Sequence, residues 1–441
     1  MNISVIGTGY VGLVTGVCLA QVGYRVTCID TDENKIGKLK RAESPIYEPG
    51  IEEMLAKNLE EKRLDFSTDY YAACSDADVI FIAVGTPQHE DGSANLSYIQ
   101  SAAENIGLHI QKDGVLIVTK STVPVGTNAK VKKWLSEKLV KDIQFEIASN
   151  PEFLREGSAI GDTFEADRIV IGTETREAAS KLEALYQPFR TTILKTTIES
   201  AEMIKYASNA FLATKISFIN EIANLCEKLD ADIDEVATGM GMDRRIGTQF
   251  LKAGIGYGGS CFPKDTNALV QIAGDIEHQF ELLESVIRVN SRQQIKLVSK
   301  ALAHFQTLKG KSAAILGLSF KPNTDDIREA AAMEMIKQLL HYGVEITVFD
   351  PVAMRNTRKV FGDQIHYAED ALEAVRGTEM AFIVTEWEEI RSLSLKALVR
   401  TMETPVVFDG RNCFSLDEAK EAGVTYYSIG RKPYETSRSE V

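Results

Sequence analysis

One cysteine directly follows a cluster of glycines, a pattern that suggests covalent chemistry. Residues 254–265 read GIGYGGSCFPKD, with four glycines in the six positions from Gly254 to Gly259. Each glycine has an ordering penalty of roughly 0.5–1 kcal/mol relative to alanine, which favours a loop whose backbone approaches a ligand closely. A free thiol is a few per cent thiolate at neutral pH, and a nearby cation such as Lys264 would raise that fraction. We predict Cys261 as a nucleophile, and the alternative is an inert thiol in a mobile loop.

Three more residues have types and spacings that suit the same reaction. Asp265, four residues after Cys261, is a candidate base for a water or an alcohol, although beside Lys264 it equally fits a surface ion pair. Lys205 and Asn209 are four apart in a helical pattern and therefore share a face. Such an ammonium and amide can hold an oxyanion, each donor contributing about 3–4 kcal/mol in comparable sites. The alternative for Lys205 is a solvated lysine on a helix surface.

A second glycine pattern lies at the N-terminus. Gly7, Gly9 and Gly12 form a GxGxxG turn that follows a predicted strand and opens a predicted helix, and Asp30 ends the next strand. This context predicts dinucleotide binding, with the pyrophosphate on the helix amides and Asp30 on the adenosine ribose. Asp32 and Glu33 would repel a 2′-phosphate, so NAD is favoured over NADP. A turn that binds nothing would leave Asp30 without a reason for its position.

A thiolate beside NAD favours one kind of oxidation. An alcohol loses hydride without covalent help, whereas an aldehyde needs a nucleophile that converts it into a tetrahedral hydride donor. We therefore predict two successive oxidations, from alcohol to acid, through a thiohemiacetal and a thioester on Cys261.

Composition excludes several classes of protein. The 441 residues suffice for about three domains, and 63 acidic against 49 basic residues give a net charge of −14. No Lys/Arg run is long enough to bind nucleic acid, and no apolar stretch approaches the ~18 residues of a membrane helix. The six cysteines have no metal-ligand spacing. A secretion signal requires a positively charged start, but this chain has no Lys or Arg before Arg25. We expect a cytoplasmic protein without a metal, a membrane partner or a nucleic-acid partner.

Hydropathy patterns predict two α/β regions around a helical one. Short β-rich runs alternate with helices in both regions, which predicts two Rossmann-like parallel-sheet domains. From about Glu199, apolar residues recur at three- and four-residue steps, which predicts one long helix. Lys205 and Lys215 are its only charges between Met203 and Asn220, so we expect a buried helix and a homodimer formed through it. The predicted domains are residues 1–198, 199–305 and 306–441. The predicted strands are Ile3–Ile6, Arg25–Ile29, Val79–Val84, Val115–Thr119, Phe145–Ala148, Ile169–Ile171, Ala313–Leu318, Glu345–Phe349 and Met380–Thr385.

Six motifs in order resemble one family. They are the turn 7–12, Gly85-Thr-Pro87, the run 121–126 (STVPVG), the run 150–156 (NPEFLRE), the run 256–265 and the run 317–321 (GLSFK). Together the chain from Met1 to about Arg431 resembles the UDP-glucose/GDP-mannose dehydrogenase family. The resemblance implies oxidation of a nucleotide sugar to its uronate with two NAD per turnover. Residues 250–257 look like the branch of the family that acts on UDP-glucose.

The resemblance also implies roles for individual residues. Cys261 would be the nucleophile, with Lys205, Asn209 and Asp265 around the reacting carbon, and Thr122 and Glu156 would position water and proton transfers near the nicotinamide. NAD would be bound by the glycine turn and by Val11, Asp30, Lys35, Thr86, Thr122, Glu156, Lys264 and Arg328. The UDP-sugar would be bound by Glu152, Phe153, Leu154, Arg155, Lys205, Asn209, Phe250, Leu251, Lys252, Ala253, Gly254, Tyr257, Gly258, Lys321, Arg245 and Arg411, of which Arg245 would reach the partner subunit's site.

Three other functions remain open at this point. A sister enzyme acting on GDP-mannose or UDP-N-acetylmannosamine would use the same chemistry with a different pocket. A simple hydroxyacid dehydrogenase would release one NADH per turnover, with Cys261 incidental. A non-catalytic NAD-responsive protein would bind without turnover.

Overall fold

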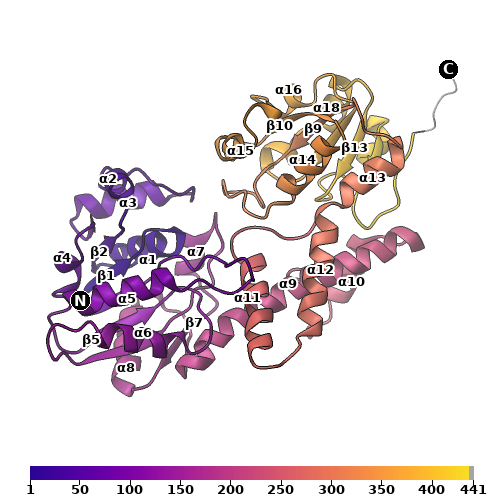
Figure 1. The fold of residues 1–441 in the computed structure, drawn as a ribbon. Helices are drawn as coiled ribbons and strands as arrows, with labels where there is room; N and C mark the ends of the chain where they lie inside the picture. The colour runs from indigo at the N-terminus through magenta and orange to yellow at the C-terminus, as the bar shows by residue number, and fades with distance from the viewer. Residues whose placement is uncertain (437–441) are drawn as a thin grey trace. The chain divides into compact units, whose positions relative to one another are not determined.

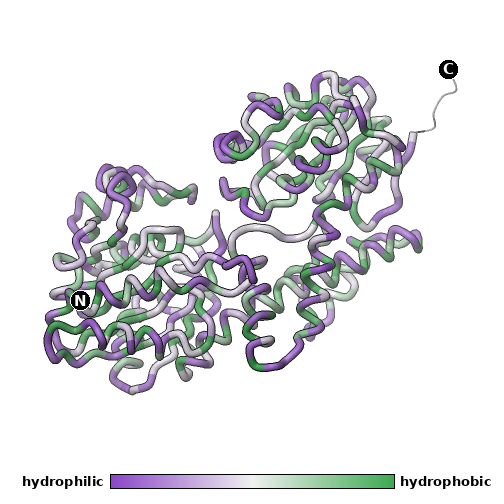
Figure 2. The backbone as a smooth tube through the Cα atoms, viewed as in Figure 1, coloured by the Kyte–Doolittle hydropathy of each residue, from purple (hydrophilic) through white to green (hydrophobic). Residues whose placement is uncertain are grey.

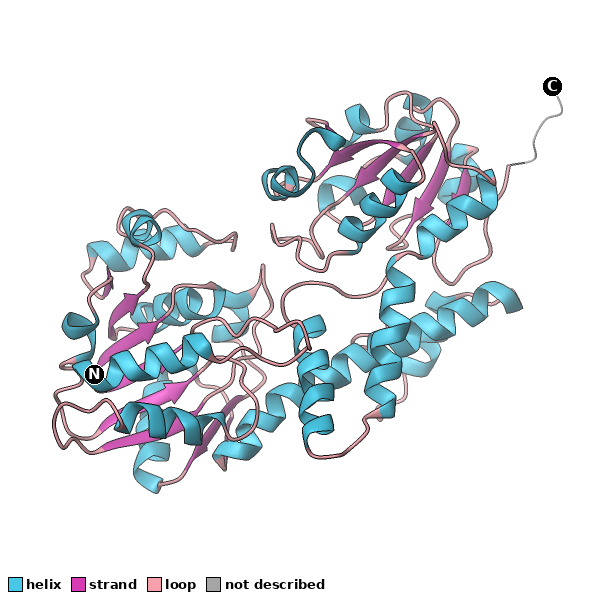
Figure 3. Ribbon diagram, viewed as in Figure 1, coloured by secondary structure: helices cyan, strands magenta, loops and turns pink. Residues whose placement is uncertain are grey.

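The computed structural model describes residues 1–436 and forms two compact units, Met1–Ser208 and Asn209–Val441. Each unit holds one β-sheet with helices packed on it (Figures 1 and 3). In sequence order, helices α9 to α13 follow the last strand of the first sheet and precede the first strand of the second. The predicted fold class is confirmed. The domain boundaries at 198 and 305 stay a prediction, and residues 437–441 of the predicted last domain lie outside the described residues.

The sheet of the first unit has eight strands in the order β3-β2-β1-β4-β5-β6-β7-β8. The order reverses between β1 and β4, and ligands of such sheets bind beyond the carboxyl ends of the strands at this point. The strands are β1 (Asn2–Ile6), β2 (Arg25–Ile29), β3 (Leu64–Ser67), β4 (Val79–Ile82), β5 (Val115–Thr119), β6 (Phe145–Ser149), β7 (Ile169–Thr173) and β8 (Ile193–Thr196).

One pairing in this sheet differs from the predicted parallel arrangement. β6 and β7 are antiparallel, with Ala148 opposite Thr173. The connection between them contains only the six-residue helix α7 (Ala159–Phe164), and β7 starts at the sheet edge where β6 ends. β7 and β8 pair in parallel and therefore both run against the first six strands.

Two apolar cores lie on opposite faces of the first sheet. In β1, Ile3 and Val5 belong to one core and Ile6 to the other, because side chains alternate along a strand. Figure 2 shows the hydrophobic stretches concentrated in the strands and in the helix faces against them. The first core is covered by α1 (Tyr10–Gln21), α2 (Glu33–Leu39), α3 (Ile51–Glu60), α7 and α8 (Arg176–Tyr186), and the second by α4 (Tyr70–Cys74), α5 (Ser97–His109) and α6 (Thr127–Ser136).

The sheet of the second unit repeats the order of the first six strands. Its order is β11-β10-β9-β12-β13-β14, and every neighbouring pair is parallel. The strands are β9 (Ser312–Leu316), β10 (Glu345–Phe349), β11 (His366–Tyr367), β12 (Met380–Ile383), β13 (Val406–Asp409) and β14 (Thr425–Tyr427). The helices on this sheet are α14 (Ala331–His341), α15 (Met354–Phe361), α16 (Ala371–Ala374), α17 (Glu388–Arg391), α18 (Leu395–Thr401) and α19 (Leu416–Ala422).

The long helix predicted from about Glu199 is α9 (Ile198–Leu229), and it has 32 residues. It is followed by α10 (Ile233–Gly241), α11 (Phe262–Asp275), α12 (Glu281–Gln294) and α13 (Lys296–Phe305). The predicted strands are all present, although three end earlier than predicted: β4 at Ile82 rather than Val84, β9 at Leu316 rather than Leu318 and β12 at Ile383 rather than Thr385. Among the described residues, β3, β8, β11, β13 and β14 are strands that the sequence patterns did not predict.

Candidate active site

The turn after β1 has the shape that a dinucleotide requires. Helix α1 begins at Tyr10 directly after its N-cap Gly9, and no side chain caps its first amides. A Cβ on Gly12 would lie 2.0 Å from the Gly7 carbonyl oxygen, so only glycine permits this close approach. A Cβ on Gly9 would meet no protein atom within 4 Å. The amides at the start of α1 therefore border open space, where a pyrophosphate fits.

Asp30 is held beside this turn as a charged acceptor. Its Oδ2 accepts hydrogen bonds from the Thr8 amide at 3.0 Å, the Thr8 hydroxyl at 2.7 Å and Lys35 Nζ at 2.7 Å. Its Oδ1 accepts one from the Asp32 amide at 3.1 Å. Burial alone would raise the pKa of Asp30, but these hydrogen bonds outweigh it and lower that pKa. The carboxylate is ionised at neutral pH, and Oδ1 can still accept a ribose hydroxyl. Val11 lies half-buried in the first turn of α1.

Two buried lysines, one directly after β5 and one on α9, lie near a buried carboxylate that follows β6. Lys205 Nζ lies 3.0 Å from Glu152 Oε1, with side-chain exposures of 4% and 6%. Burial lowers the pKa of Lys120 to about 8, although the Glu152 charge opposes this, and Lys120 Nζ donates to Asn150 Oδ1 at 3.1 Å. Burial would raise the pKa of Glu152, but Lys205 and the Leu154 amide lower it. Lys205 is therefore a buried, partnered lysine and not a solvated one.

Sequence reasoning missed Lys120. Its available signal was a lysine directly after β5, separated by one residue from the apolar run 115–118, a position where a charge is unusual.

The other predicted residues of the first unit gather near the same sheet edge. Thr86 Oγ1 donates to the Thr122 carbonyl at 2.9 Å and so joins the turns after β4 and β5. The Phe153 ring lies 5.4 Å from Lys205 Nζ. Arg155 is bound to Asp162 at 2.5 Å and its side chain is 65% exposed, so its guanidinium is committed to α7. The structure thus places Glu152 to Glu156 on one connection between β6 and α7.

In the second unit, amide side chains hold the glycine-rich loop. Asn290 of α12 accepts from the Tyr257 amide at 2.8 Å and donates to its carbonyl at 3.0 Å. Gln293 donates to the Gly254 carbonyl at 2.7 Å, and Asn220 of α9 accepts from the Gly254 amide at 2.9 Å. The loop is therefore fixed by α9 and α12. These three amide residues were not predicted, because nothing in their local sequence links them to residues 254–257.

The glycines of this loop have an internal packing role. A Cβ on Gly258 would lie 2.2 Å from the Glu329 carbonyl oxygen, and one on Gly256 would lie 2.6 Å from Asn290 Oδ1. The glycines were interpreted above as favouring close approach to a ligand, and at these two positions the close approach is to other parts of the protein. The backbone approaches other protein segments here, which by itself accounts for glycine at these positions.

Cys261 lies at the N-cap of α11, a helix of 14 residues. The partial positive charge of a helix N-terminus favours a thiolate at such a position. One turn later, Asp265 is 1% exposed and accepts hydrogen bonds from Asn209 Nδ2 at 2.6 Å and Lys264 Nζ at 2.5 Å. Lys264 and Asp265 thus form an ion pair that is largely buried, and not the surface pair left open above. The carboxylate and the ammonium of the two residues 264 and 265, shortly after Cys261 in the chain, therefore lie together with an amide from α9.

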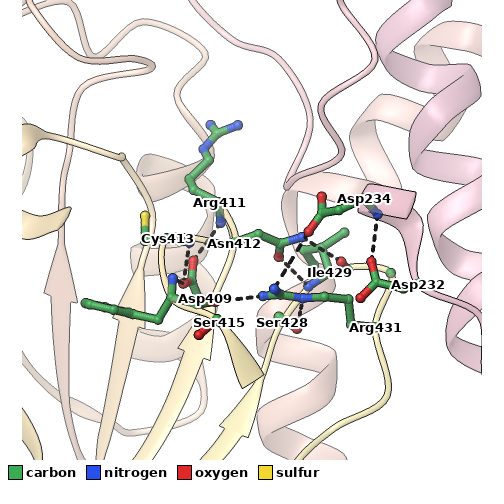
Figure 4. Close-up of polar contacts among 12 residues, drawn as sticks. Asp232, Asp234, Asp409, Arg411, Asn412, Cys413, Ser415, Ser428, Ile429 and Arg431 are labelled. Carbon is green, nitrogen blue, oxygen red and sulfur yellow. Dashed lines mark hydrogen bonds and ion pairs between the residues drawn. The ribbon is translucent and has the colours of Figure 1, made fainter. Parts of the chain in front are cut away.

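Arg411 lies two residues after Asp409, the last residue of β13 (Figure 4), and its guanidinium is tied to the glycine-rich loop. Its Nε donates to the Val384 carbonyl at 2.8 Å and its Nη1 to the Gly256 carbonyl at 3.3 Å. Its amide donates to Asp409 at 2.8 Å, and the buried Arg431 donates to the Phe414 carbonyl at 3.0 Å. Arg411 is therefore held by backbone carbonyls and is not a free surface arginine.

Two other predicted cations have different surroundings. Arg245 pairs with Asp243 at 2.5 Å and its side chain is 88% exposed, while Arg328 pairs with Asp326 at 2.6 Å and is 65% exposed. Lys321 Nζ lies 5.5 Å from the Phe320 ring. Leu251, Ala253, Tyr257 and Gly258 are buried, Phe250 is half-buried and Lys252 is exposed.

Two absences concern residues 1–436 only. Within that range, no group of three or more His, Cys, Asp or Glu side chains is arranged to hold a metal ion. The helices of the same range include none with the length and apolar character that crossing a membrane requires.

The chain matches known proteins along its whole length. Residues 1–190, 199–292 and 314–416 match, respectively, the NAD binding, central and UDP binding domains of the UDP-glucose/GDP-mannose dehydrogenase family. UDP-glucose 6-dehydrogenase YwqF of Bacillus subtilis is 58% identical over 432 residues, covering 98% of each chain. The structure of a UDP-glucose dehydrogenase from Pyrobaculum islandicum is 39% identical with a TM-score of 0.92, covering 98% of each chain. That of a UDP-D-ManNAc dehydrogenase from Pyrococcus horikoshii is 26% identical with a TM-score of 0.85, covering 98% of this chain and 99% of the other.

Proposed function

Because the chain belongs to the UDP-glucose/GDP-mannose dehydrogenase family, we propose that it oxidises UDP-glucose to UDP-glucuronate in two NAD-dependent steps. The sequence identities favour this substrate. The chain is 58% and 39% identical to two UDP-glucose dehydrogenases, but only 26% identical to a UDP-D-ManNAc dehydrogenase. The observation that carries the proposal is the position of Cys261 at the start of α11, followed by the buried Asp265 with its Asn209 and Lys264 partners.

Cys261 acts between the two oxidations. The sugar alcohol first loses hydride and a proton and becomes an aldehyde. The Cys261 sulfur adds to the aldehyde carbon and gives a thiohemiacetal, which loses a second hydride and its hydroxyl proton and becomes a thioester. Water then cleaves the thioester, which frees the acid and returns the thiol. Two electron pairs leave per sugar, so two NAD are reduced.

The buried charged groups suit these steps. Asp265 is the candidate base for the alcohol or the water, and Asn209 and Lys205 are candidate donors to the developing oxyanion. Each donor already has a carboxylate partner, Asp265 for Asn209 and Glu152 for Lys205, which fixes its orientation. Thr122 and Glu156 are proposed to position the water and its protons.

Cofactor and substrate are assigned to different elements. NAD, when bound, accepts the hydride. Gly7, Gly9, Gly12 and Asp30 fit its pyrophosphate and ribose, as the open space at Gly9 and the unshared side of Asp30 support. We assign the other cofactor contacts to Val11, Lys35, Thr86, Thr122, Glu156, Lys264 and Arg328. The UDP-sugar contacts are assigned to residues 152–155 and 250–254 and to Lys205, Asn209, Arg245, Tyr257, Gly258, Lys321 and Arg411.

The test is a count of products. Purified protein is mixed with NAD and a panel of nucleotide sugars, and NADH is counted per sugar consumed. We expect two NADH per UDP-glucose and slower turnover of GDP-mannose and UDP-N-acetylmannosamine. One NADH per substrate would favour a hydroxyacid dehydrogenase, and binding without turnover would favour a non-catalytic protein.

The covalent step has a matched control. Cys261→Ser should abolish turnover and keep NAD and sugar binding, whereas Cys413→Ser should turn over normally, because burial raises the pKa of the Cys413 thiol far above its ordinary value. Turnover by the Cys261 variant would contradict the mechanism.

Helix α9 carries an uncovered apolar stripe that supports the proposed homodimer. Phe211, Phe218, Leu225 and Leu229 are 65%, 51%, 52% and 74% exposed. Their spacing of seven, seven and four residues places them on one side of a helix. Light scattering should show a dimer, and Phe218→Asp should weaken it.

The six free cysteines support a reducing compartment, and we propose the cytoplasm. The three domains, 1–198, 199–305 and 306–441, complete the proposal.

A further inference from the structure

A tyrosine in the nucleotide turn contacts the connection that carries Glu152 and Glu156. Tyr10 is the first residue of α1, and its phenol donates a hydrogen bond to Glu48. The amide of Gly157, the residue after Glu156, donates to the Tyr10 oxygen at 2.5 Å and to Glu48 Oε2 at 2.7 Å. Two side chains from distant parts of the first unit therefore hold one amide.

Glu48 also caps the helix that follows. Its Oε1 accepts a hydrogen bond from the Ile160 amide, in the first turn of α7, at 3.2 Å. The N-cap residue Ser158 makes no capping hydrogen bond with its own side chain, so Glu48 supplies this function from a remote loop. Glu48 is only 5% exposed, and its carboxylate is used by Tyr10, Gly157 and Ile160.

The connection 152–160 is thus anchored at both ends. At its start, Glu152 pairs with Lys205 and accepts from the Leu154 amide at 2.6 Å. At its end, Gly157 and Ile160 are held by the Tyr10 and Glu48 pair. Between these anchors lies Glu156, whose charge is close enough to help raise the pKa of the Tyr10 phenol, after burial and Glu48. The phenol stays a neutral donor across the range of ordinary assays.

We propose that Tyr10 and Glu48 are positioning residues for the reaction: they fix Glu156 and its connection relative to the first turn of α1, where the cofactor is expected. The proposal rests on the proposed function, which assigns proton transfer to Glu156 and the pyrophosphate to that turn. Neither side chain touches the reacting atoms. The contact of Tyr10 and Glu48 with Gly157 sets the position of Glu156, the proposed proton-transfer group. Loss of this contact should therefore slow the chemical step more than it weakens binding.

The chain offers a matched control for the phenol. Tyr24 lies in the same unit, and its hydroxyl donates to the Leu185 carbonyl at 3.0 Å, outside the connection 152–160. Tyr10→Phe and Glu48→Gln should each lower kcat about 10- to 100-fold, the range expected when a reacting group is displaced by up to an ångström. The KM for UDP-glucose should rise by a smaller factor than kcat falls, because Lys205 and the Leu154 amide still hold Glu152 at the start of the connection, and the Kd for NAD should change little. Tyr24→Phe should keep kcat, and the double variant Tyr10→Phe/Glu48→Gln should be less than additive, because the two residues share one hydrogen bond.

Amide hydrogen exchange separates this proposal from the proposed function. Peptides covering residues 152–160 should exchange faster in Tyr10→Phe than in wild type or in Tyr24→Phe, whether or not the wild type oxidises UDP-glucose. Unchanged exchange would overturn the proposal, as would a kcat for Tyr10→Phe equal to that of Tyr24→Phe. If the wild type does not turn over UDP-glucose but Tyr10→Phe exchanges faster, the proposed function is overturned and the anchoring of the connection by Tyr10 and Glu48 is still supported.

Discussion

The two sheets share a strand order, yet the turns after their first strands are built differently. β1 and β9 each end at a glycine with positive φ, Gly7 at +98° and Gly317 at +92°. In both units the acid after the second strand, Asp30 or Asp350, accepts hydrogen bonds from that turn. The common part is therefore a strand, a glycine and an acid that ties the turn to the sheet.

The acid of the second unit is closed off. Asp350 is 1% exposed, and its oxygens accept from five residues: Leu318, Ser319, Val352, Ala353 and the Trp387 indole. Helix α14 begins only at Ala331, whereas α1 begins directly after the glycine turn. Only the first unit combines helix amides beside open space with an acid that can accept another hydrogen bond. The same scaffold thus serves as a cofactor site in one unit and as internal structure in the other.

The largest predicted effect is on folding of the second unit. Asp350→Ala would leave several buried donors without an acceptor, and we expect it to lower the free energy of unfolding by about 4 kcal/mol. NAD affinity of the folded protein should not change. Differential scanning calorimetry with a parallel titration of NAD would measure both. A thermal shift no larger than that of Asp30→Ala would remove the difference between the two acids.

The reciprocal change should affect the cofactor. Asp30→Ala removes an ionised acceptor, and hydrogen bonds to such groups contribute about 1.5–3 kcal/mol, so the Kd for NAD should rise about 10- to 100-fold. Sugar affinity and thermal stability should change little, because Asp30 is only half-buried. Isothermal titration calorimetry with each ligand decides this. An equal fall in sugar affinity would put the cofactor assignment in doubt.

Buried cations also differ between the units, and this difference is visible in pH dependence. Lys120 has a folded-state pKa lowered by burial to about 8, below the ~10.4 of an unfolded lysine, so its contribution to stability rises with pH between these values. Lys120→Met lacks this pH-dependent gain. Its free energy of unfolding, compared with that of wild type at the same pH, should therefore fall by about 2 kcal/mol between pH 8 and 9.5. Arginine as a residue type keeps its charge at every pH of such a titration, so Arg431→Met in the second unit is the control, with a constant difference from wild type. Urea titrations across pH would show it, and parallel curves for the Lys120 variant would contradict the prediction.

The smallest expected effect comes from Gly9. A methyl group there meets no protein atom, so Gly9→Ala should keep the thermal midpoint and weaken NAD binding by about tenfold through loss of the space beside the helix amides. Gly12→Ala would press its methyl against the Gly7 carbonyl oxygen and should lower the midpoint of the first unit. Fluorescence titration of NADH and thermal melts of both variants make the comparison. Unchanged NAD affinity in Gly9→Ala would argue against a pyrophosphate at this turn.

Local patterns were enough to predict much of the fold. Continuous apolar runs such as β4 and β5 and the long periodic stretch of α9 have signals within the segment itself. β8 has the sequence ILKT with an exposed Leu194, and β11 has two residues, so neither has enough apolar length to stand out from a loop. The antiparallel step at β7 depends on where the connection places the next strand, which no local pattern records.

The site shows the same division. Cys261, Asp30 and the glycine turn lie in motifs whose spacing carries the chemistry. Asn290 and Glu48 act on loops that are distant in sequence, and their identity is ordinary for a polar helix or a surface loop. Such residues become recognisable only when their hydrogen-bond partners are known.

The reversal at β7 separates two kinds of connection in the first unit. Because β7 runs against β6, the turn after β7 opens at the sheet edge opposite the nucleotide turn. Glu174 is exposed in that turn, where it forms an exposed ion pair with Lys132. A fluorophore or an affinity tag inserted there would report on the protein without disturbing cofactor chemistry, so this edge is the natural handle for single-molecule work.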